Sequence, residues 1–286
     1  MAVNVAVWNA KGGVGKSTVA YNFAAIAARA LTPRDAQGRP TAARVLLVDV
    51  DYQGSATGVL LGQDIVFSDR DTGQPTLLDV LEGKVKALSQ ATYRVELEEK
   101  ENCPAAFLDV VPSRFDMIHL DTSLNQPRGL FALKKLLAQV EASYSLIIVD
   151  CPANLGGFVN NALVACPNLV VPVMPGRFEL VALNTLMTAV DTLRETGMAP
   201  DLRIVAYQPI RMTNTTLSRD TLDGLTAQYN GHVLPPISQL QIVQWAQVAQ
   251  QDILTHAGAA DKSARQFVTA THELLKILGL RKGGRK

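Results

Sequence analysis

Lys11-Gly12-Gly13-Val14-Gly15-Lys16-Ser17-Thr18 is the stretch that decides the fold of this 286-residue chain. It lies between an apolar run, Val3 to Asn9, and a helical pattern, Ser17 to Leu31. A strand, a glycine-rich loop and a helix in this order bring backbone N–H groups and a helix N-terminus together, and this arrangement binds phosphate. The sequence therefore predicts a P-loop that holds a nucleotide together with Mg²⁺.

The side chains of this loop have separate predicted roles. Lys16 is expected to reach the β- and γ-phosphates, the Ser17 hydroxyl to ligate Mg²⁺, and Thr18 to reach the α-phosphate. The three glycines allow positive φ angles and a close approach of backbone to phosphate. Ala10 replaces the first glycine of the strict P-loop pattern, and Lys11 follows it. The predicted nucleotide-binding set of the loop is Gly12, Gly13, Val14, Gly15, Lys16, Ser17 and Thr18.

Carboxylates follow two of the predicted strands. The run Leu146 to Asp150 ends in one, and we expect Asp150 to hold Mg²⁺, through a water molecule. Asp49 and Asp51 lie on the same side of an extended chain, so both can face the γ-phosphate. Asp49 completes the predicted metal set with Ser17 and Asp150, and Asp51 is expected to position the attacking water. The alternative is that these aspartates only cap the following turns.

Apolar runs alternate with helical patterns along the whole chain. This alternation predicts an α/β fold with three layers, a doubly wound and mostly parallel sheet of about seven to eight strands. The predicted strands are Val3 to Asn9, Val45 to Val50, Phe107 to Val111, Leu146 to Asp150, Asn168 to Val173, Leu202 to Tyr207 and a weaker His232 to Leu234. The predicted helices are Ser17 to Leu31, Gly129 to Ala142, Leu180 to Thr196, Ser218 to Tyr229 and Ala264 to Leu278.

The rest of the chain is expected to form connections within one domain, residues 1–286. Thr32 to Arg44 is predicted to be a surface loop, and the charged run Arg94 to Glu101 a solvated face. The first strand begins so early that no N-terminal helix-turn-helix domain is expected. Residues 281–286 are expected to be a flexible basic tail.

Composition limits the possible classes of protein. A net charge of +1 gives no overall attraction to nucleic acid or membrane, so such affinity must come from local patches. The three cysteines suit free thiols in a reducing compartment and show no spacing for an iron–sulfur cluster. No stretch reaches the roughly 18 apolar residues of a spanning helix. A soluble, cytoplasmic protein is therefore expected.

Three motifs occur in an order typical of one family. They are Lys11 to Thr18, Val48 to Thr57 and Val149 to Pro152. Together they resemble the deviant-Walker partition ATPases of the ParA/Soj family, within the ParA/MinD superfamily. The likeness continues through Thr76 to Leu81, Leu108 to Ser113 and Val171 to Leu183. Tyr52 stands where that family usually has proline.

The resemblance implies a slow ATPase with ATP and Mg²⁺ as cofactors and Lys11, Lys16 and Asp51 as its catalytic residues. It implies an ATP-dependent sandwich homodimer in which Lys11 reaches the nucleotide of the other subunit. That dimer would bind DNA without sequence preference at the nucleoid, until a ParB-like or centromere-binding protein stimulates hydrolysis. The output would be segregation of plasmid or chromosomal DNA or positioning of other cargo. By family position, Gln208, Pro209 and residues 175–179 would contact adenine.

The predicted DNA contacts are few. Relatives tend to carry arginine in a late stretch that reads Pro235 to Trp245 here, without a basic residue. A few phosphate contacts give weak, salt-sensitive affinity, which dimerisation increases. The candidates are Arg203, Arg211, Arg219, Arg281, Lys282, Arg285 and Lys286.

The last predicted helix, Ala264 to Leu278, leaves a second function open. Its apolar positions recur at helical spacing and a basic tail follows. Either this stripe packs on the sheet, or the helix lies on a membrane surface, as in MinD-type ATPases that act in cell-division site placement. We favour packing, and membrane is not an expected partner. A small-molecule synthetase or kinase is also compatible with the P-loop, although Lys11 argues against it.

Overall fold

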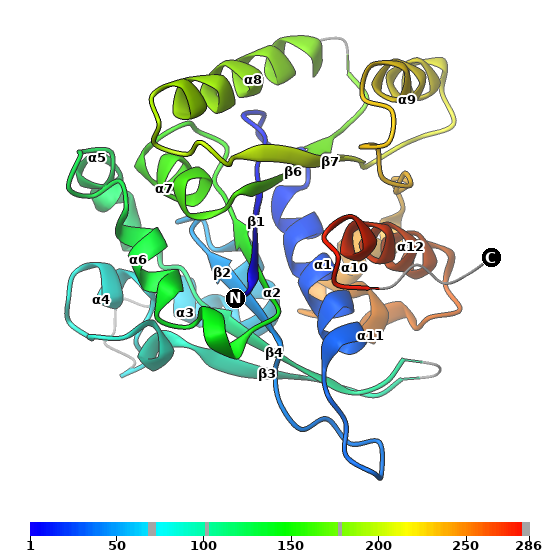
Figure 1. The fold of residues 1–286 in the computed structure, drawn as a ribbon. Coiled ribbons are helices and arrows are strands. Elements are labelled where there is room, and N and C mark those ends of the chain that lie inside the picture. Colours follow the sequence, from blue (N-terminus) through cyan, green and yellow to red (C-terminus); the bar gives the residue numbers. More distant parts are fainter. Residues whose placement is uncertain (68–72, 101–102, 177–178, 282–286) are drawn as a thin grey trace.

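One seven-stranded sheet organises the protein (Figure 1). The computed structural model describes residues 1–67, 73–100, 103–176 and 179–281. The strand order is β3-β4-β2-β5-β1-β6-β7, and all neighbours are parallel except β3 and β4. The strands are β1 Val3–Val7, β2 Val45–Asp49, β3 Tyr93–Leu97, β4 Ala106–Val111, β5 Leu146–Asp150, β6 Asn168–Val173 and β7 Arg203–Pro209.

Helices cover both faces of the sheet, which confirms the predicted three-layer α/β class. The α-helices are α1 Lys16–Leu31, α2 Ser55–Leu61, α3 Gln63–Phe67, α4 Leu77–Leu81, α5 Asp121–Leu124, α6 Ala132–Ala138, α7 Gly157–Ala165, α8 Glu179–Glu195, α9 Thr216–Gln228, α10 Gln241–Val248, α11 Ile253–Ala257 and α12 Lys262–Ile277. Three 3₁₀ turns are η1 Leu88–Ala91, η2 Phe115–Leu120 and η3 Glu141–Ser143.

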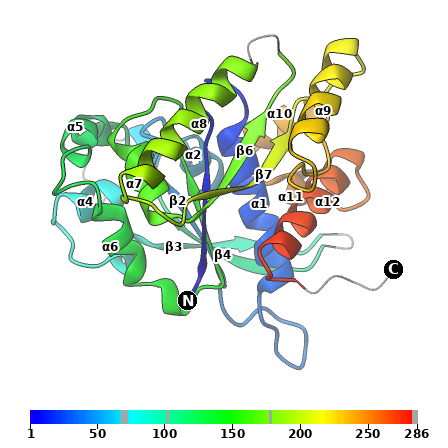
Figure 2. The same cartoon turned by 45° about the horizontal axis from the view of Figure 1, so that its top comes forward.

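The strands bury both of their sides, and successive residues enter different cores. Val5 and Val7 of β1 pack with α1, α10, α11 and α12, whereas Ala6 and the following Trp8 pack with the layer that contains α4, α6, α7 and α8. This follows from the two-residue period of a strand. Figures 1 and 2 show α1 and α12 side by side on one face.

Chain order reverses at β1, and this places the site. The chain leaves β1 for β2 on one side, and later crosses from β5 to β6 on the other side of β1. In open α/β sheets, ligands bind at the carboxyl ends of the strands beside such a switch point. The loop after β1 is the stretch Lys11 to Gly15, so the topology puts the predicted P-loop there.

Several sequence predictions of individual elements are wrong. The charged run Arg94 to Glu101 is not only a solvated face, since its first half lies in edge strand β3, where Arg94 pairs with Asp109 of β4 at 2.9 Å. His232 to Leu234 forms one isolated bridge, Val233 to Tyr207, rather than a strand. The helix predicted from Gly129 is shorter, because α6 begins at Ala132.

The last helix turns its apolar side inward. Phe267, Leu274 and Leu275 of α12 are at most 1% exposed and pack in the core that contains α1. This is the packing reading of the stripe, and it leaves these side chains unavailable to a membrane surface in this conformation. Among the described residues, no helix is both long and apolar enough to cross a membrane.

A close helix contact at Gly157 provides a test of the fold. A Cβ at Gly157 would lie 2.0 Å from the Asp121 carbonyl oxygen, whereas a Cβ at Gly224 of α9 would meet nothing within 4 Å. We expect Gly157→Ala to lower the free energy of unfolding by about 1–3 kcal/mol through overpacking. Gly224→Ala should raise it by about 0.5–1 kcal/mol through helix propensity. Urea titrations measure both, and similar effects of the two substitutions would contradict this packing.

Candidate nucleotide site

A cavity of about 520 Å³ opens at the carboxyl edge of the sheet. Its lining comes from the P-loop, the loops after β2, β5 and β7, and the segment that leads into α10. The residues that line it include Gly12, Gly13, Gly15, Lys16, Ser17, Thr18, Tyr21, Asp51, Tyr52, Arg211, Leu240, Val243, Gln244, Gln247 and Phe267. The sequence prediction of a phosphate loop at this edge therefore coincides with a concave site.

The P-loop backbone has the shape that glycine permits. Gly13 and Gly15 have φ angles of 71° and 93°, which L-residues rarely adopt, while Gly12 does not share this conformation. Gly15 is the N-cap of α1, so the helix begins at the loop. The Lys16 ammonium donates to the Lys11 carbonyl oxygen at 3.0 Å, which folds the loop around it. Backbone N–H groups and a helix N-terminus thus face the cavity together.

Asp150 is the strongest indication of a cation in this site. It ends β5 and is fully buried, and among the described residues neither of its carboxylate oxygens has a hydrogen-bond partner of normal geometry. Burial raises its pKa well above the ordinary value, as do the charges of Asp49 and Asp51, while the nearby Ser17 hydroxyl and the Lys16 ammonium oppose the rise. A buried carboxylate without partners requires an explanation, and Mg²⁺ held with the Ser17 hydroxyl provides one.

Asp49 lies beside Asp150 but is already bonded. The two residues pair in register across β2 and β5. One Asp49 oxygen accepts from the Asp51 N–H at 3.1 Å, and the other accepts from the Thr57 N–H at 2.9 Å and the Thr57 hydroxyl at 2.7 Å. Burial raises the pKa of Asp49 to about 7, and Asp51 adds to the rise. Asp49 thus orders the following loop, and its role as a metal ligand stays a prediction.

Asp51 lines the cavity within a tight turn. Its carboxylate accepts from the Gln53 N–H at 3.0 Å and its carbonyl accepts from the Gly54 N–H at 2.8 Å. Burial raises the pKa of Asp51, and the Gln53 N–H and Lys16 oppose this. Both readings of the sequence therefore hold in part, because Asp51 caps a turn and also faces the cavity. Its part in hydrolysis stays a prediction.

Lys16 is the cation among these three carboxylates. Its side chain is nearly buried, and this burial lowers its pKa while Asp150 and Asp51 oppose the change. An ammonium that is largely shielded from water at a helix N-terminus binds phosphate oxygens strongly, because the local dielectric constant is low. The site therefore combines a cation for phosphate with carboxylates for a metal ion.

Two residues of the loop do not line the cavity. Val14 is fully buried and lies outside the lining. Lys11 lies outside the cavity lining, and its N–H donates to the Asn9 carboxamide oxygen at 3.0 Å. Its reach into a second subunit stays a prediction.

The other end of the cavity differs from what family position suggests. Gln208 is fully buried, with its amide donating to the Pro209 and Pro235 carbonyl oxygens at 2.7 and 3.1 Å. Neither Gln208 nor Pro209 lines the cavity, and two of residues 175–179 lie outside the described part of the chain. This end of the cavity is lined instead by residues between 237 and 247, which the sequence analysis did not identify as site residues. Their signal in the sequence is a glutamine-rich stretch without a charged residue.

The predicted DNA-binding arginines do not share one surface. Arg203 begins β7 and donates to Asn168 at 3.1 Å, whereas Arg211 follows the other end of that strand. Arg211 lines the cavity and donates to the Gly13 carbonyl oxygen at 2.8 Å. Arg219 is exposed on α9, and Arg281 is exposed after α12. Lys282, Arg285 and Lys286 lie outside the described residues.

Comparisons with known sequences agree on one family. The family model described as an AAA domain matches residues 2–204. The chromosome partitioning protein ParA of Myxococcus xanthus is 32% identical over 70% of this chain and 62% of its own length. The cell division protein PomZ of the same organism is 31% identical over 85% of this chain and 68% of its own length. This chain thus matches slightly less than two thirds of that ParA.

Solved structures have the same fold. The ATP complex of a Cyanothece McdA variant matches with a TM-score of 0.77 at 16% identity, over 99% of each chain. Cobyrinic acid a,c-diamide synthase from Mycobacterium smegmatis with bound ADP and magnesium matches with a TM-score of 0.73 at 26% identity, over 98% of this chain and 96% of that one. Both share the mostly parallel sheet described here.

The buried carboxylates predict how stability depends on pH. Raised pKa values at Asp49 and Asp150 mean that the folded state binds more protons than the unfolded state, so the free energy of unfolding should fall as pH rises from about 4 to about 7. We expect Asp150→Asn to raise this free energy at pH 7 by on the order of 1–3 kcal/mol and to weaken the pH dependence, because it removes the buried charge.

Urea titrations of the nucleotide-free protein between pH 5 and pH 8 measure this effect. The exposed Asp201, changed to asparagine, is the matched control and should leave stability nearly unchanged. An Asp150→Asn protein that is no more stable than the wild type would mean that the carboxylate is already compensated within the protein.

Proposed function

Because the chain belongs to the AAA-domain family of ParA- and Soj-type P-loop ATPases, we propose that it is a partition ATPase whose ATP-bound dimer binds DNA. ATP and Mg²⁺ are its cofactors, as the family and the site chemistry together require. Hydrolysis is slow in the isolated protein, and a ParB-like or centromere-binding protein accelerates it. The protein acts in the cytoplasm, at the nucleoid, and moves or positions DNA or another cargo.

The observation that carries this proposal is the buried Asp150 beside Lys16 at the P-loop, whose carboxylate oxygens have no hydrogen-bond partner among the described residues. Lys16 holds the β- and γ-phosphates, and Asp150 with Ser17 holds the metal ion. Bound Mg²⁺ neutralises charge that develops on the phosphates. Asp51 orients the attacking water, and Asp49 keeps the Asp51 turn in place through its bond to the Asp51 N–H.

The proposed dimer gives Lys11 its role. In this dimer, Lys11 reaches the phosphates bound in the partner subunit, and its positive charge offsets the negative charge of the triphosphate. The Lys11 carbonyl oxygen accepts from Lys16 within its own subunit, so the loop that carries Lys11 is held by the residue that binds phosphate. ATP rather than ADP is therefore the signal for assembly.

DNA binding in this proposal comes from exposed basic residues. Arg219 is exposed on α9, and Arg211 lines the cavity and donates to the Gly13 carbonyl oxygen of the P-loop. Arg203 and Arg281 are further candidates, together with the basic residues that follow. Such phosphate contacts carry no base readout, so affinity depends on salt and not on sequence.

Gel filtration with Mg²⁺ and ATP tests the dimer switch. The wild type should elute as a dimer with ATP and as a monomer with ADP. Lys16→Ala should remain monomeric because it loses nucleotide binding, and Lys11→Ala should bind nucleotide but fail to dimerise. Asp51→Ala should remain dimeric, with hydrolysis reduced roughly 100-fold or more. The exposed Lys86, changed to alanine, is the control. A monomeric Asp51→Ala protein in saturating ATP would remove Asp51 from the hydrolytic role.

Co-sedimentation with DNA at low salt tests the DNA-binding step. Binding should occur with ATP and be weak with ADP or without nucleotide. Arg219→Ala should weaken binding and lower the salt dependence by roughly one phosphate contact per subunit. Arg39→Ala, at an exposed loop arginine paired with Asp35, is the matched control and should have no effect. Equal DNA binding in all three nucleotide states would exclude this function.

A further inference from the structure

The segment that contains α10 and α11 forms one wall of the cavity and is tied to α1 by side chains. Gln244 and Gln247 of α10 line the cavity, with Val243 and Leu240 beside them. The Gln247 amide donates to the Thr18 hydroxyl at 2.9 Å. The position of α10 therefore sets how closely this wall approaches the helix that begins at the phosphate loop.

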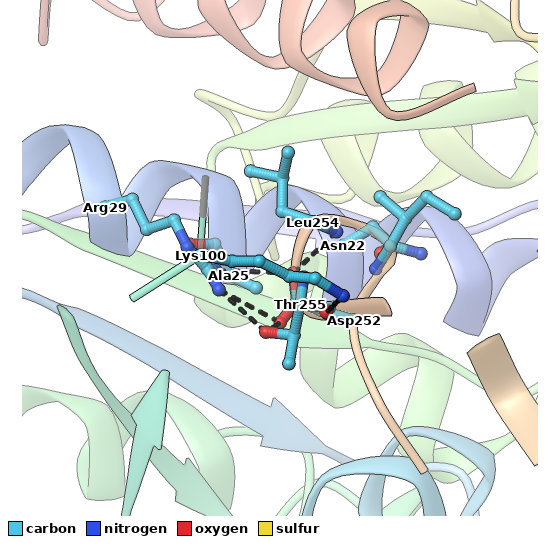
Figure 3. Close-up of polar contacts among 8 residues, drawn as sticks. Asn22, Ala25, Arg29, Lys100, Asp252, Leu254 and Thr255 are labelled. Atoms are coloured by element: carbon cyan, nitrogen blue, oxygen red, sulfur yellow. Dashed lines mark hydrogen bonds and ion pairs between the residues drawn. The ribbon is translucent and has the colours of Figure 1, made fainter. Parts of the chain in front are cut away.

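A buried ion pair anchors the next helix. Arg29, in the last turn of α1, donates from two nitrogens to the two Asp252 oxygens at 3.3 Å each, and to the Thr255 hydroxyl at 2.8 Å (Figure 3). The side chains of Arg29 and Asp252 are only 4% and 1% exposed. Two charges removed from water are tolerated in a protein only where they are paired and hydrogen-bonded.

Both ends of the short helix α11 are held from outside. At its start, Asp252 accepts from the Leu254 and Thr255 N–H groups, and Asn22 of α1 accepts from the Ile253 N–H at 2.8 Å. At its end, Lys100 donates to the Thr255 and His256 carbonyl oxygens at 2.8 and 2.7 Å. The unpaired groups that a helix leaves at its termini are therefore used to fix α11 in place.

The same contacts reach the phosphate loop. Asn22 also donates to the Thr18 carbonyl oxygen at 2.9 Å, so one side chain joins Thr18 to the start of α11. Between the two helices, Gln250 has a φ of 54°, a conformation that non-glycine residues keep only where their surroundings impose it. The wall helix α10 is thus fixed at Thr18 on one side and at the anchored α11 on the other.

We propose that Arg29, Asp252, Asn22 and Lys100 form a positioning clamp that holds α10 against Thr18 and thereby sets the affinity of the site for nucleotide. The proposal rests on the nucleotide-binding function proposed above. None of the four residues lines the cavity, so they act on it indirectly, through the position of α10 and its contact at Gln247 and, for Asn22, also through the Thr18 carbonyl oxygen. The clamp requires an arginine late in α1 and an aspartate directly before α11, which are Arg29 and Asp252 in this chain.

The test measures MgADP binding by calorimetry and the KM and kcat for MgATP, on the full chain at 25 °C. Asp252→Asn keeps the cap shape but removes the charge facing Arg29. It should raise the dissociation constant and KM roughly 3- to 10-fold, while kcat at saturation stays within about 2-fold. Lys100→Met, at the exposed end of the clamp, should also raise the dissociation constant and KM, by a smaller factor than Asp252→Asn does. An unchanged affinity in a less stable protein would reduce the clamp to a structural role and overturn the proposal.

A double-mutant cycle separates positioning from general loosening. If the clamp acts through Gln247, then Asp252→Asn should add little to the affinity loss of Gln247→Ala. Fully additive losses would overturn the proposal. Glu273→Gln, which removes an exposed ion pair with Lys276 on α12, is the matched control and should change neither KM nor affinity.

Two further variants keep the outcomes distinct. If Asp252→Asn does not fold, Arg29→Lys and Lys100→Met decide the question, since Arg29→Lys keeps the positive charge at the buried position and Lys100→Met changes only an exposed side chain. Lys16→Ala must abolish nucleotide binding for the proposed function to stand. A Lys16→Ala protein that binds MgADP normally would overturn that function, whereas normal affinity in the clamp variants alone would overturn only the clamp.

Discussion

The rest of this structure depends on the burial of three carboxylates around one lysine at the carboxyl edge of the sheet. Parallel strands end at the same edge, so β2 and β5 bring Asp49 and Asp150 into register, and the turn after β2 adds Asp51. Burial disfavours every one of these charges, and Lys16 balances only part of them. Such an arrangement is costly for the fold alone and is explained by a ligand that carries both phosphate and metal.

The three carboxylates differ because the protein gives them different partners. Asp49 accepts from the hydroxyl of Thr57 in α2, and this hydroxyl accepts from the Ser113 N–H at 3.0 Å. These two bonds connect the end of β2, helix α2 and the loop after β4. Within the described part of the chain, one Asp51 oxygen accepts from the Gln53 N–H, and neither Asp150 oxygen has a partner. The freedom to bind a ligand therefore increases from Asp49 to Asp51 to Asp150. The residue after Asp51, Tyr52, extends these contacts, since its ring packs edge-on against the Phe115 ring with 6.4 Å between the two ring centroids.

Local patterns were sufficient to predict the sheet and the phosphate end of the site. Strands such as Leu146 to Asp150 are apolar up to their last residue, and the P-loop is contiguous in sequence, so both can be recognised from short stretches. Strand β3 was missed because an edge strand exposes charged side chains such as Arg94 and Glu96. Helix α7 was missed for the opposite reason, since it is buried almost all round and has no polar face to give a helical period.

The far wall of the site could not be predicted, because it depends on contacts between residues more than 200 positions apart in sequence. Nothing in the local pattern around Gln247 indicates that it meets Thr18, and the pairing of Arg29 with Asp252 is visible only in three dimensions. Glutamine suits the position that meets Thr18, because a neutral amide can donate to a hydroxyl, as Gln247 does at 2.9 Å, without adding a further charge to a cavity that Lys16 and Arg211 already line.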